Sequence, residues 1–368
     1  MRIFAKQLLA ILVTAFILLG AAKKQKKEEI TQTHEILPDP PSAVTVETGK
    51  LEFVAVPLSN KGLLSAQTRE GLKTLQRLSR GGTIVKIRAW VAGTGDLRRI
   101  GTIVSEVFSE KKLPLPAVSV IQIGLLPMEG AQVQLEAVIA AKKVVNPHGL
   151  MFLSGMGGTG KDPTEKINAL TQKAIDDLRT AAKFAGSGPE DLLRVSCLVS
   201  SLDQYAELRN MVSTAFPHAS VTFMQAQRAM ANSLSECEAV GRLAKPVTEP
   251  VVYLSPAEMN PSPNYAKAVL VSAPRIIITG TQMAFHYTDA DVRLAFGRMA
   301  KVLELSKGSI KRVIFSSFYP LSGGMVEKVR NIRFEFFDKA HAPAATMIPY
   351  EGLPGMDASM AIELVAVP

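Results

Sequence analysis

The sequence has few of the residues that build disulfide frameworks and metal sites: its 368 residues include two cysteines and five histidines. Two cysteines are too few for a disulfide scaffold. Cys197 and Cys237 lie in strand-like runs, and we expect buried free thiols; a bridge is the alternative if the strands are neighbours in an oxidising compartment. The histidines occur at no ligand spacing, so we expect neither a metal nor another cofactor: His34, His148, His218, His286 and His341.

Aromatic residues are also sparse, at 6% of the chain, whereas the formal net charge is +9. Part of the positive excess lies in residues 1–27, and the remainder is spread thinly without interleaved basic and aromatic residues. A single-strand-binding surface combines a basic groove with stacking aromatics. We therefore expect no nucleic-acid partner and interpret the charge as a solvated basic surface.

The N-terminus resembles a targeting segment. Residues 1–22 contain a basic start, an apolar run from Leu8 to Leu19 and the small residues Gly20, Ala21 and Ala22. This pattern predicts a signal peptide cleaved after Ala22, and hence export to the periplasm or outside the cell. Lysines directly after the cleavage position are atypical, so an uncleaved N-terminal anchor is the alternative. Residues 23–43, charged and then proline-rich, are typical of a linker.

Beyond the linker, one pattern of elements occurs three times. Helical spacing predicts helices over residues 68–80, 163–185 and 291–305, and each is followed by a strand, a second helix and two further strands. Helices alternating with strands predict an α+β fold with helices on one face of each sheet. We expect three units, at 44–143, 144–245 and 251–368. Each ends in a similar strand: Val133–Ala140, Ser235–Arg242 and Met360–Val367.

The unit ends carry a resemblance to a known family. In the first unit, Pro116-Ala117-Val118-Ser119, Leu126-Pro127 and Leu135-Glu136-Ala137 occur in order; residues 262–282, SPNYAKAVLVSAPRIIITGTQ, and residues 146–157, NPHGLMFLSGMG, form similar openings. These motifs resemble the RidA (YjgF/YER057c/UK114) family over nearly all of residues 44–368. The resemblance implies chorismate-mutase-like domains. Because single-domain members form homotrimers, it also implies a monomer that acts as its own trimer.

The resemblance implies an activity and the loss of its main binding residue. Family enzymes hydrolyse reactive enamines and imines derived from amino acids and release ammonia, and an arginine in Pro-Ala-Arg-Ser grips the substrate carboxylate. A planar guanidinium does so through two parallel hydrogen bonds, which an aliphatic side chain cannot make. That arginine is absent from all three units, where its positions are occupied by Val118, Ala219 and Ala345.

Other family site residues are present in part. The acidic residue of the last strand, which can act as general base, corresponds to Gln134, Glu236 and Ala361, so only Glu236 keeps a carboxylate. The strand-end hydroxyl corresponds to Ser154 and Thr279. The aromatic near the start of a unit corresponds to Tyr265. A basic residue elsewhere could replace the missing arginine, and Arg228 is a candidate because it lies between the last two strands of the second unit.

Two classes of function follow. The first is a degenerate RidA-like deaminase, with Glu236, Ser154 and Thr279 as catalytic candidates. The second is a non-catalytic protein that binds a small molecule in clefts between units or serves as a scaffold. The sequence does not support the ribonuclease activity described for some family members, because it has no histidine pair and no basic groove with stacking aromatics.

Residues 153–166, LSGMGGTGKDPTEK, match two nucleotide-binding patterns through Gly155, Gly157, Gly160 and Lys161. A phosphate loop needs a helix that begins at the last glycine. Here Asp162-Pro163-x-Glu165 reads as a later helix start with a carboxylate at its mouth, which would repel an anion. We therefore expect a strand-to-helix connector and no nucleotide.

Overall fold

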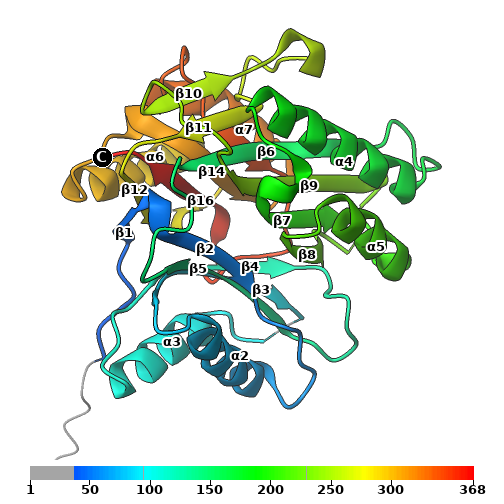
Figure 1. The fold of residues 1–368 in the computed structure, drawn as a ribbon. Coiled ribbons are helices and arrows are strands. Elements are labelled where there is room, and N and C mark those ends of the chain that lie inside the picture. Colours follow the sequence, from blue (N-terminus) through cyan, green and yellow to red (C-terminus); the bar gives the residue numbers. More distant parts are fainter. Residues whose placement is uncertain (1–36, 94, 229) are drawn as a thin grey trace, which may run out of the picture. The chain divides into compact units, whose positions relative to one another are not determined.

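Three β-sheets, each covered by two α-helices, make up the fold (Figure 1). The computed structural model describes residues 37–93, 95–228 and 230–368. The predicted leader and all but the end of the linker lie outside the described residues, so cleavage, anchoring and export remain predictions. Residues Pro38–Pro368 form one compact unit. Among the described residues, no helix is long and apolar enough to cross a membrane.

The first sheet has four strands in the order β2-β5-β3-β4. Its central strand, β3, pairs in parallel with β4 and antiparallel with β5. Helices α2 and α3 cover its outer face through one apolar cluster. The elements are β2 (Leu51–Ala55), α2 (Leu64–Leu78), β3 (Thr83–Ala92), α3 (Arg98–Glu110), β4 (Ala117–Ile123) and β5 (Val133–Ala140).

The second sheet has six strands in the order β10-β11-β6-β9-β7-β8. Its strand β7 pairs in parallel with β8 and antiparallel with β9, and α4 and α5 cover the sheet. The elements are β6 (Leu150–Thr159), α4 (Ile167–Phe184), β7 (Leu192–Val199), α5 (Tyr205–Ala215), β8 (Ser220–Gln225), β9 (Leu234–Arg242), β10 (Val251–Leu254) and β11 (Ala268–Val271).

The third sheet has the order β1-β12-β16-β14-β15, with β13 also paired to β16. Strand β14 pairs in parallel with β15 and antiparallel with β16, and α6 and α7 cover the sheet. The elements are β1 (Ala43–Glu47), β12 (Arg275–Thr279), β13 (Gln282–Phe285), α6 (Asp289–Leu305), β14 (Val313–Pro320), α7 (Gly323–Phe336), β15 (Ala344–Met347) and β16 (Ala358–Ala366). The predicted mixed α+β class and the order of helices and strands are confirmed.

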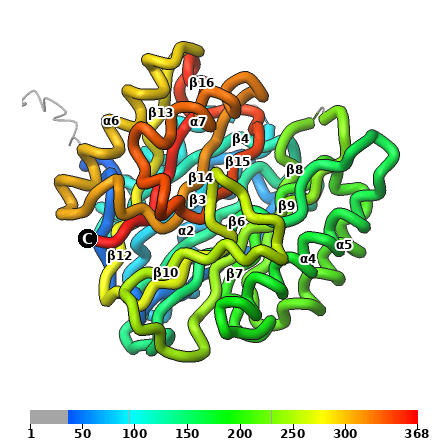
Figure 2. Tube along the Cα trace, turned by 90° about the horizontal axis from the view of Figure 1, so that it is seen from above, coloured from blue at the N-terminus to red at the C-terminus, as the bar shows by residue number. Residues whose placement is uncertain are grey.

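Sheets are completed by strands from distant parts of the chain. Strand β1 pairs with β12 of the third sheet, although β2, which follows it directly, lies in the first. Strand β11 pairs with β6 of the second sheet, although β12 lies in the third. In Figure 1 the blue β1 lies beside the yellow β12, and Figure 2 shows α4 and α5 on the opposite side of the molecule from α6. The three sheets are therefore linked through their edges.

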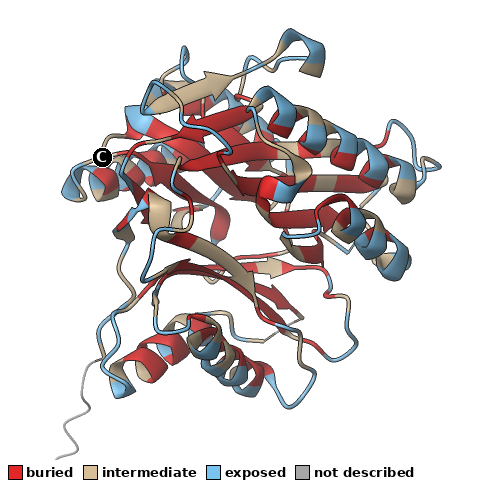
Figure 3. Cartoon of the chain, in the orientation of Figure 1, coloured by how far each residue is buried: buried red, intermediate tan, exposed pale blue. Residues whose placement is uncertain are grey.

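The inner faces of the three sheets pack against one another, while the helices turn their polar faces outward (Figure 3). One apolar cluster contains Val138 of β5, Phe152 of β6 and Ile276 of β12. A second cluster lies further along the same faces, where Trp90 stacks on Tyr350 with ring centroids 6.0 Å apart. Buried faces of this kind supply most of the stabilisation, because apolar area is removed from water on both sides of each sheet.

Two sequence interpretations of the second unit are corrected. Cys197 of β7 and Cys237 of β9 lie directly opposite each other and form a disulfide, with Cα atoms 4.1 Å apart, so the expectation of free thiols is wrong.

Strand β6 continues to Thr159, and α4 begins only at Ile167. Asp162 is therefore no helix cap; its carboxylate accepts a hydrogen bond from the Thr164 amide inside the connecting loop. The glycine pattern lies largely in a strand.

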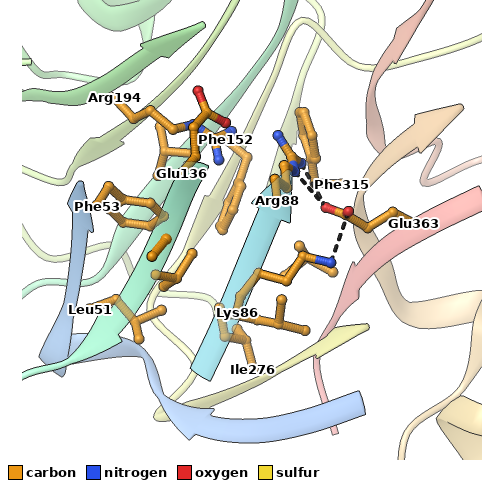
Figure 4. A pocket seen from close by; sticks show the side chains of 15 residues that line it. Leu51, Phe53, Lys86, Arg88, Glu136, Phe152, Arg194, Ile276, Phe315 and Glu363 are labelled. Atoms are coloured by element: carbon orange, nitrogen blue, oxygen red, sulfur yellow. Dashed lines mark hydrogen bonds and ion pairs between the residues drawn. The ribbon is translucent and has the colours of Figure 1, made fainter. Parts of the chain in front are cut away.

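Charged side chains occupy the centre, between the two apolar clusters (Figure 4). The Arg88 guanidinium donates to Glu238 Oε1 of β9 at 2.7 Å and to Glu363 Oε1 of β16 at 2.8 Å. Lys86 Nζ lies 2.9 Å from Glu363 Oε2. Burial by itself raises the pKa of Glu363, but Arg88 and Lys86 outweigh it and hold that pKa at about 2. One arginine of the first sheet thus joins carboxylates of the other two.

Replacing Arg88 with methionine should destabilise the protein by roughly 3–5 kcal/mol, because two buried carboxylates would lose their main partner. The measurement is urea unfolding followed by circular dichroism. Arg98→Met is the matched control, since its ion pair with Asp96 is exposed, and its unfolding midpoint should stay near wild type. Equal midpoints for the two variants would show that the buried pairs contribute nothing net.

Candidate functional site

Strand register identifies equivalent positions in the three sheets, and these can be compared with the motif positions expected from the sequence. Ser119, Thr222 and Thr346 each pair with one residue of the central strands β3, β7 and β14, respectively. On its other side, that central-strand residue pairs with a glutamate of the last strand of the sheet. Ser119, Thr222 and Thr346 are therefore at equivalent positions. The residue before each is Val118, Val221 and Ala345. The second motif position is therefore Val221, and the assignment of Ala219 was displaced by two residues.

A cleft lies between β6 and β9 of the second sheet and α7 and β15 of the third, and we call it the α7 cleft. It has a volume of about 340 Å³, within the range of small-molecule sites. The cleft brings together three residues singled out from the sequence, Glu236, Tyr265 and Ala345. Its lining residues are Gly155, Glu236, Ser262, Asn264, Tyr265, Arg330, Arg333, Ala345 and Met347.

Glu236 supplies the carboxyl group of the α7 cleft. It lies on β9 opposite Gly157, and its carboxyl packs against Gly155, where an added Cβ would lie 2.1 Å from Glu236 Oε1. Burial raises the pKa of Glu236 to about 8, with a further rise from Glu238 and an opposing effect from Arg330. The group is therefore mostly neutral at pH 7 and can donate a hydrogen bond or a proton.

Arg333 is the cleft residue that the sequence reading missed. It lies on α7 and is 2% exposed, yet its Nε and Nη2 atoms have no hydrogen-bond partner within the described part of the chain. Burial lowers its pKa to about 10, and the neighbouring Arg330 lowers it further. The sequence contains one indication of this position. Arg333 continues the helical spacing of Val326 and Val329, both buried, so it lies on the apolar face of the helix.

The two hydroxyl candidates serve the backbone instead. Ser154 Oγ donates to the Ala266 carbonyl at 2.6 Å and accepts from the Ala345 amide at 2.8 Å, which ties β6 to the third sheet beside the α7 cleft. Thr279 Oγ1 accepts from the Leu364 amide at 2.9 Å. Both side chains are fully buried and neither lines the cleft. Both hydroxyls therefore hold neighbouring strands in place, and neither faces the cleft.

Arg228 lies elsewhere, at a junction of three loops. Its Nε donates to the Gly124 carbonyl at 3.1 Å, and its backbone amide donates to Glu351. Val118 lies at the contact of β4 with the turn after β12, where an added Cβ on Gly280 would lie 2.9 Å from its carbonyl oxygen. The structure does not bring either residue together with Glu236.

A second cleft, with a volume of about 470 Å³, lies between the first and second sheets. Its lining includes Gln134, Val221, Tyr205 and Arg209. Gln134 donates to the Val56 carbonyl at 2.6 Å, and its amide has no acidic proton that could serve in acid–base catalysis. The α7 cleft is thus the better candidate for chemistry. Among the described residues, no group of three or more metal-binding side chains lies close enough together to hold an ion.

No family model matches the chain, and no curated protein matches it. Solved structures of the RidA/YjgF family resemble part of it. A Rid-family protein from Yersinia pestis is 17% identical, with a TM-score of 0.29, over 33% of this chain and 100% of that chain. YjgF-family proteins from Neisseria meningitidis and Mycobacterium tuberculosis are both 15% identical, with TM-scores of 0.24 and 0.23, over 32% of this chain and 93% and 99% of theirs.

The raised pKa of Glu236 should make the stability of the protein fall as the pH rises from about 4.5 to about 8. In this window the unfolded state has lost a proton that the folded state still holds, so deprotonation favours unfolding. Glu236→Gln should remove this loss, and urea midpoints measured at several pH values will show it.

Glu304→Gln is the control for that comparison, because Glu304 is exposed at the end of α6. Its midpoints should run parallel to those of wild type. A constant difference between Glu236→Gln and wild type from pH 4 to pH 9 would contradict the assigned pKa.

Proposed function

We propose that residues 44–368 are three RidA-like units that form an intramolecular pseudo-trimer, and that the α7 cleft binds a small carboxylate. The pairing of the strands supports the first part. In each sheet a central strand has a parallel neighbour on one side and an antiparallel neighbour on the other, and Glu136, Glu238 and Glu363 lie opposite equivalent positions of that central strand. The strands β1 and β11 are then exchanged between units.

The observation that carries the binding proposal is the unpartnered guanidinium of Arg333. A buried polar group without a partner is costly, and an arginine offers a planar fork that matches a carboxylate through two hydrogen bonds. In the family pattern this role belongs to the strand position that Ala345 occupies here. Arg333 lines the same cleft from α7, so the cation reaches the cleft from a helix, and the small Ala345 side chain leaves room for the ligand.

Glu236 supports imine hydrolysis as a second candidate function of the same cleft. A neutral carboxyl can protonate the nitrogen of an imine, and the resulting carboxylate can take a proton from the water that attacks the imine carbon. The reprotonated carboxyl then gives its proton to the carbinolamine nitrogen, and the carboxylate takes the hydroxyl proton as the carbon–nitrogen bond breaks. The products of one imine and one water are a ketone and ammonia, and Glu236 is protonated again. Arg333 would hold the substrate carboxylate meanwhile, and no cofactor or metal is needed for this balance.

Calorimetric titration with 2-oxobutyrate, a stable monocarboxylate, tests binding. Wild type should bind it, and Arg333→Gln should weaken binding by roughly 10- to 100-fold, the value of a charged bidentate pair. Arg209→Gln, in the second cleft, should bind like wild type. The unliganded Arg333→Gln protein should unfold at the same or a higher temperature, because a buried unpaired charge is removed. No binding by wild type, or equal binding by Arg333→Gln, would refute the proposal.

Ammonia release from iminobutyrate-type substrates tests catalysis separately. Glu236→Gln should abolish turnover while 2-oxobutyrate still binds. Gly155→Ala should also reduce turnover, because its methyl group would displace the Glu236 carboxyl. Gly297→Ala is the matched control, since an added Cβ at this α6 position meets nothing within 4 Å. Turnover by Glu236→Gln at the wild-type rate would contradict a catalytic role of Glu236, and carboxylate binding would then be the only function proposed for the α7 cleft.

A further inference from the structure

Arg330 gives the α7 cleft a second cation at a different depth. It lies one helical turn before Arg333, and residues three apart on a helix are neighbours on one face, with Cβ atoms about 5–6 Å apart. Arg333 is buried, whereas the Arg330 side chain is 46% exposed, and both line the cleft. The cleft therefore has one buried and one solvent-accessible cation.

The acidic groups near the cleft leave this cation available. Glu327 accepts one hydrogen bond from Arg330 Nη1, at 2.5 Å, but this pair is exposed and stands one turn apart on the same helix. Such pairs contribute little, and a guanidinium has five N–H donors, so the remaining four can meet a ligand. Glu236 is the one acidic residue of the lining. Two guanidinium groups thus share a cleft with a single carboxyl.

The loop before β11 adds polar groups to the cleft without adding charge. The backbone amide of Asn264 donates to Ser262 Oγ at 3.1 Å, and Ser262 forms an isolated antiparallel β-bridge with Tyr265. These contacts fold residues 262–265 into a turn. Ser262, Asn264 and Tyr265 all line the cleft. Neutral donors and acceptors suit the middle of a ligand whose ends are anionic.

We propose that the ligand of the α7 cleft is a short dicarboxylate, with one carboxylate on Arg333 and the other on Arg330. This inference rests on the proposed binding function and deepens it. The two side chains start one turn apart on the same helix face, so a short ligand with two carboxylates can contact both cations. The second cleft, whose lining contains one arginine, Arg209, gives a ligand no second cation.

Titration of one protein with two ligands tests the proposal. 2-Oxoglutarate and 2-oxobutyrate share the oxo acid group and differ in the second carboxylate. At about 150 mM salt, where long-range attraction between exposed charges is screened, wild type should bind 2-oxoglutarate roughly tenfold or more tightly than 2-oxobutyrate. Arg330→Gln should lose this preference, because its affinity for 2-oxoglutarate should fall more than its affinity for 2-oxobutyrate.

Lys328→Gln is the matched control, because it removes the same charge from α7 at a residue that pairs with Asp289 outside the cleft. It should keep the preference for 2-oxoglutarate. Equal affinities of wild type for the two ligands, or the same loss of 2-oxoglutarate binding in Arg330→Gln and Lys328→Gln, would overturn the dicarboxylate proposal while leaving monocarboxylate binding intact. Failure of wild type to bind either ligand would overturn the proposed function as well.

Discussion

The arrangement of the three sheets depends on a buried cluster of charges centred on Arg88. Arg88 of the first sheet bonds carboxylates of the second and third sheets, Glu238 and Glu363, at the point where the three inner faces meet. Apolar clusters on either side bury area but would tolerate small rotations between sheets, since dispersion contacts are not directional. Hydrogen-bonded charges fix orientation, because a misaligned buried ion is costly. The cluster thus sets how the sheets, and hence the clefts between them, are arranged.

The same centre shows how the three parts of the chain differ. Arg88 faces Glu136 on its own sheet, while the equivalent positions on the other central strands carry Ser196 and Ser317. The two glutamates that Arg88 bonds therefore lie opposite serines on their own sheets. This asymmetry extends to the clefts, where Glu236 has a glutamine counterpart in Gln134. A single chain can therefore concentrate its chemistry at one boundary.

Sequence periodicity predicted most of the fold, because local spacing decides which residues form helices and strands. The strands β5 and β16 and the helices α4 and α6 lie within a few residues of their predicted places. Glu236, Tyr265 and Ala345 were assigned to a cleft from motif order alone. The disulfide was considered only as the alternative to free thiols, and the pairings of β1 and β11 and the role of Arg333 were not predicted. Each depends on which segments become neighbours. From sequence alone, an arginine such as Arg333 is expected at the surface, because the strands that cover this face of α7 come from another part of the chain.

The exchange of strands has a consequence for biosynthesis. Strand β1 is synthesised more than 200 residues before its partner β12, and Thr48 donates a hydrogen bond to the Ala273 carbonyl across a separation of 225 residues. Until that partner is made, the β1 edge carries unpaired amides and carbonyls, which invite pairing with other chains. Such long-range contacts also slow folding. The nascent chain must therefore keep this edge covered or separated until the third sheet emerges.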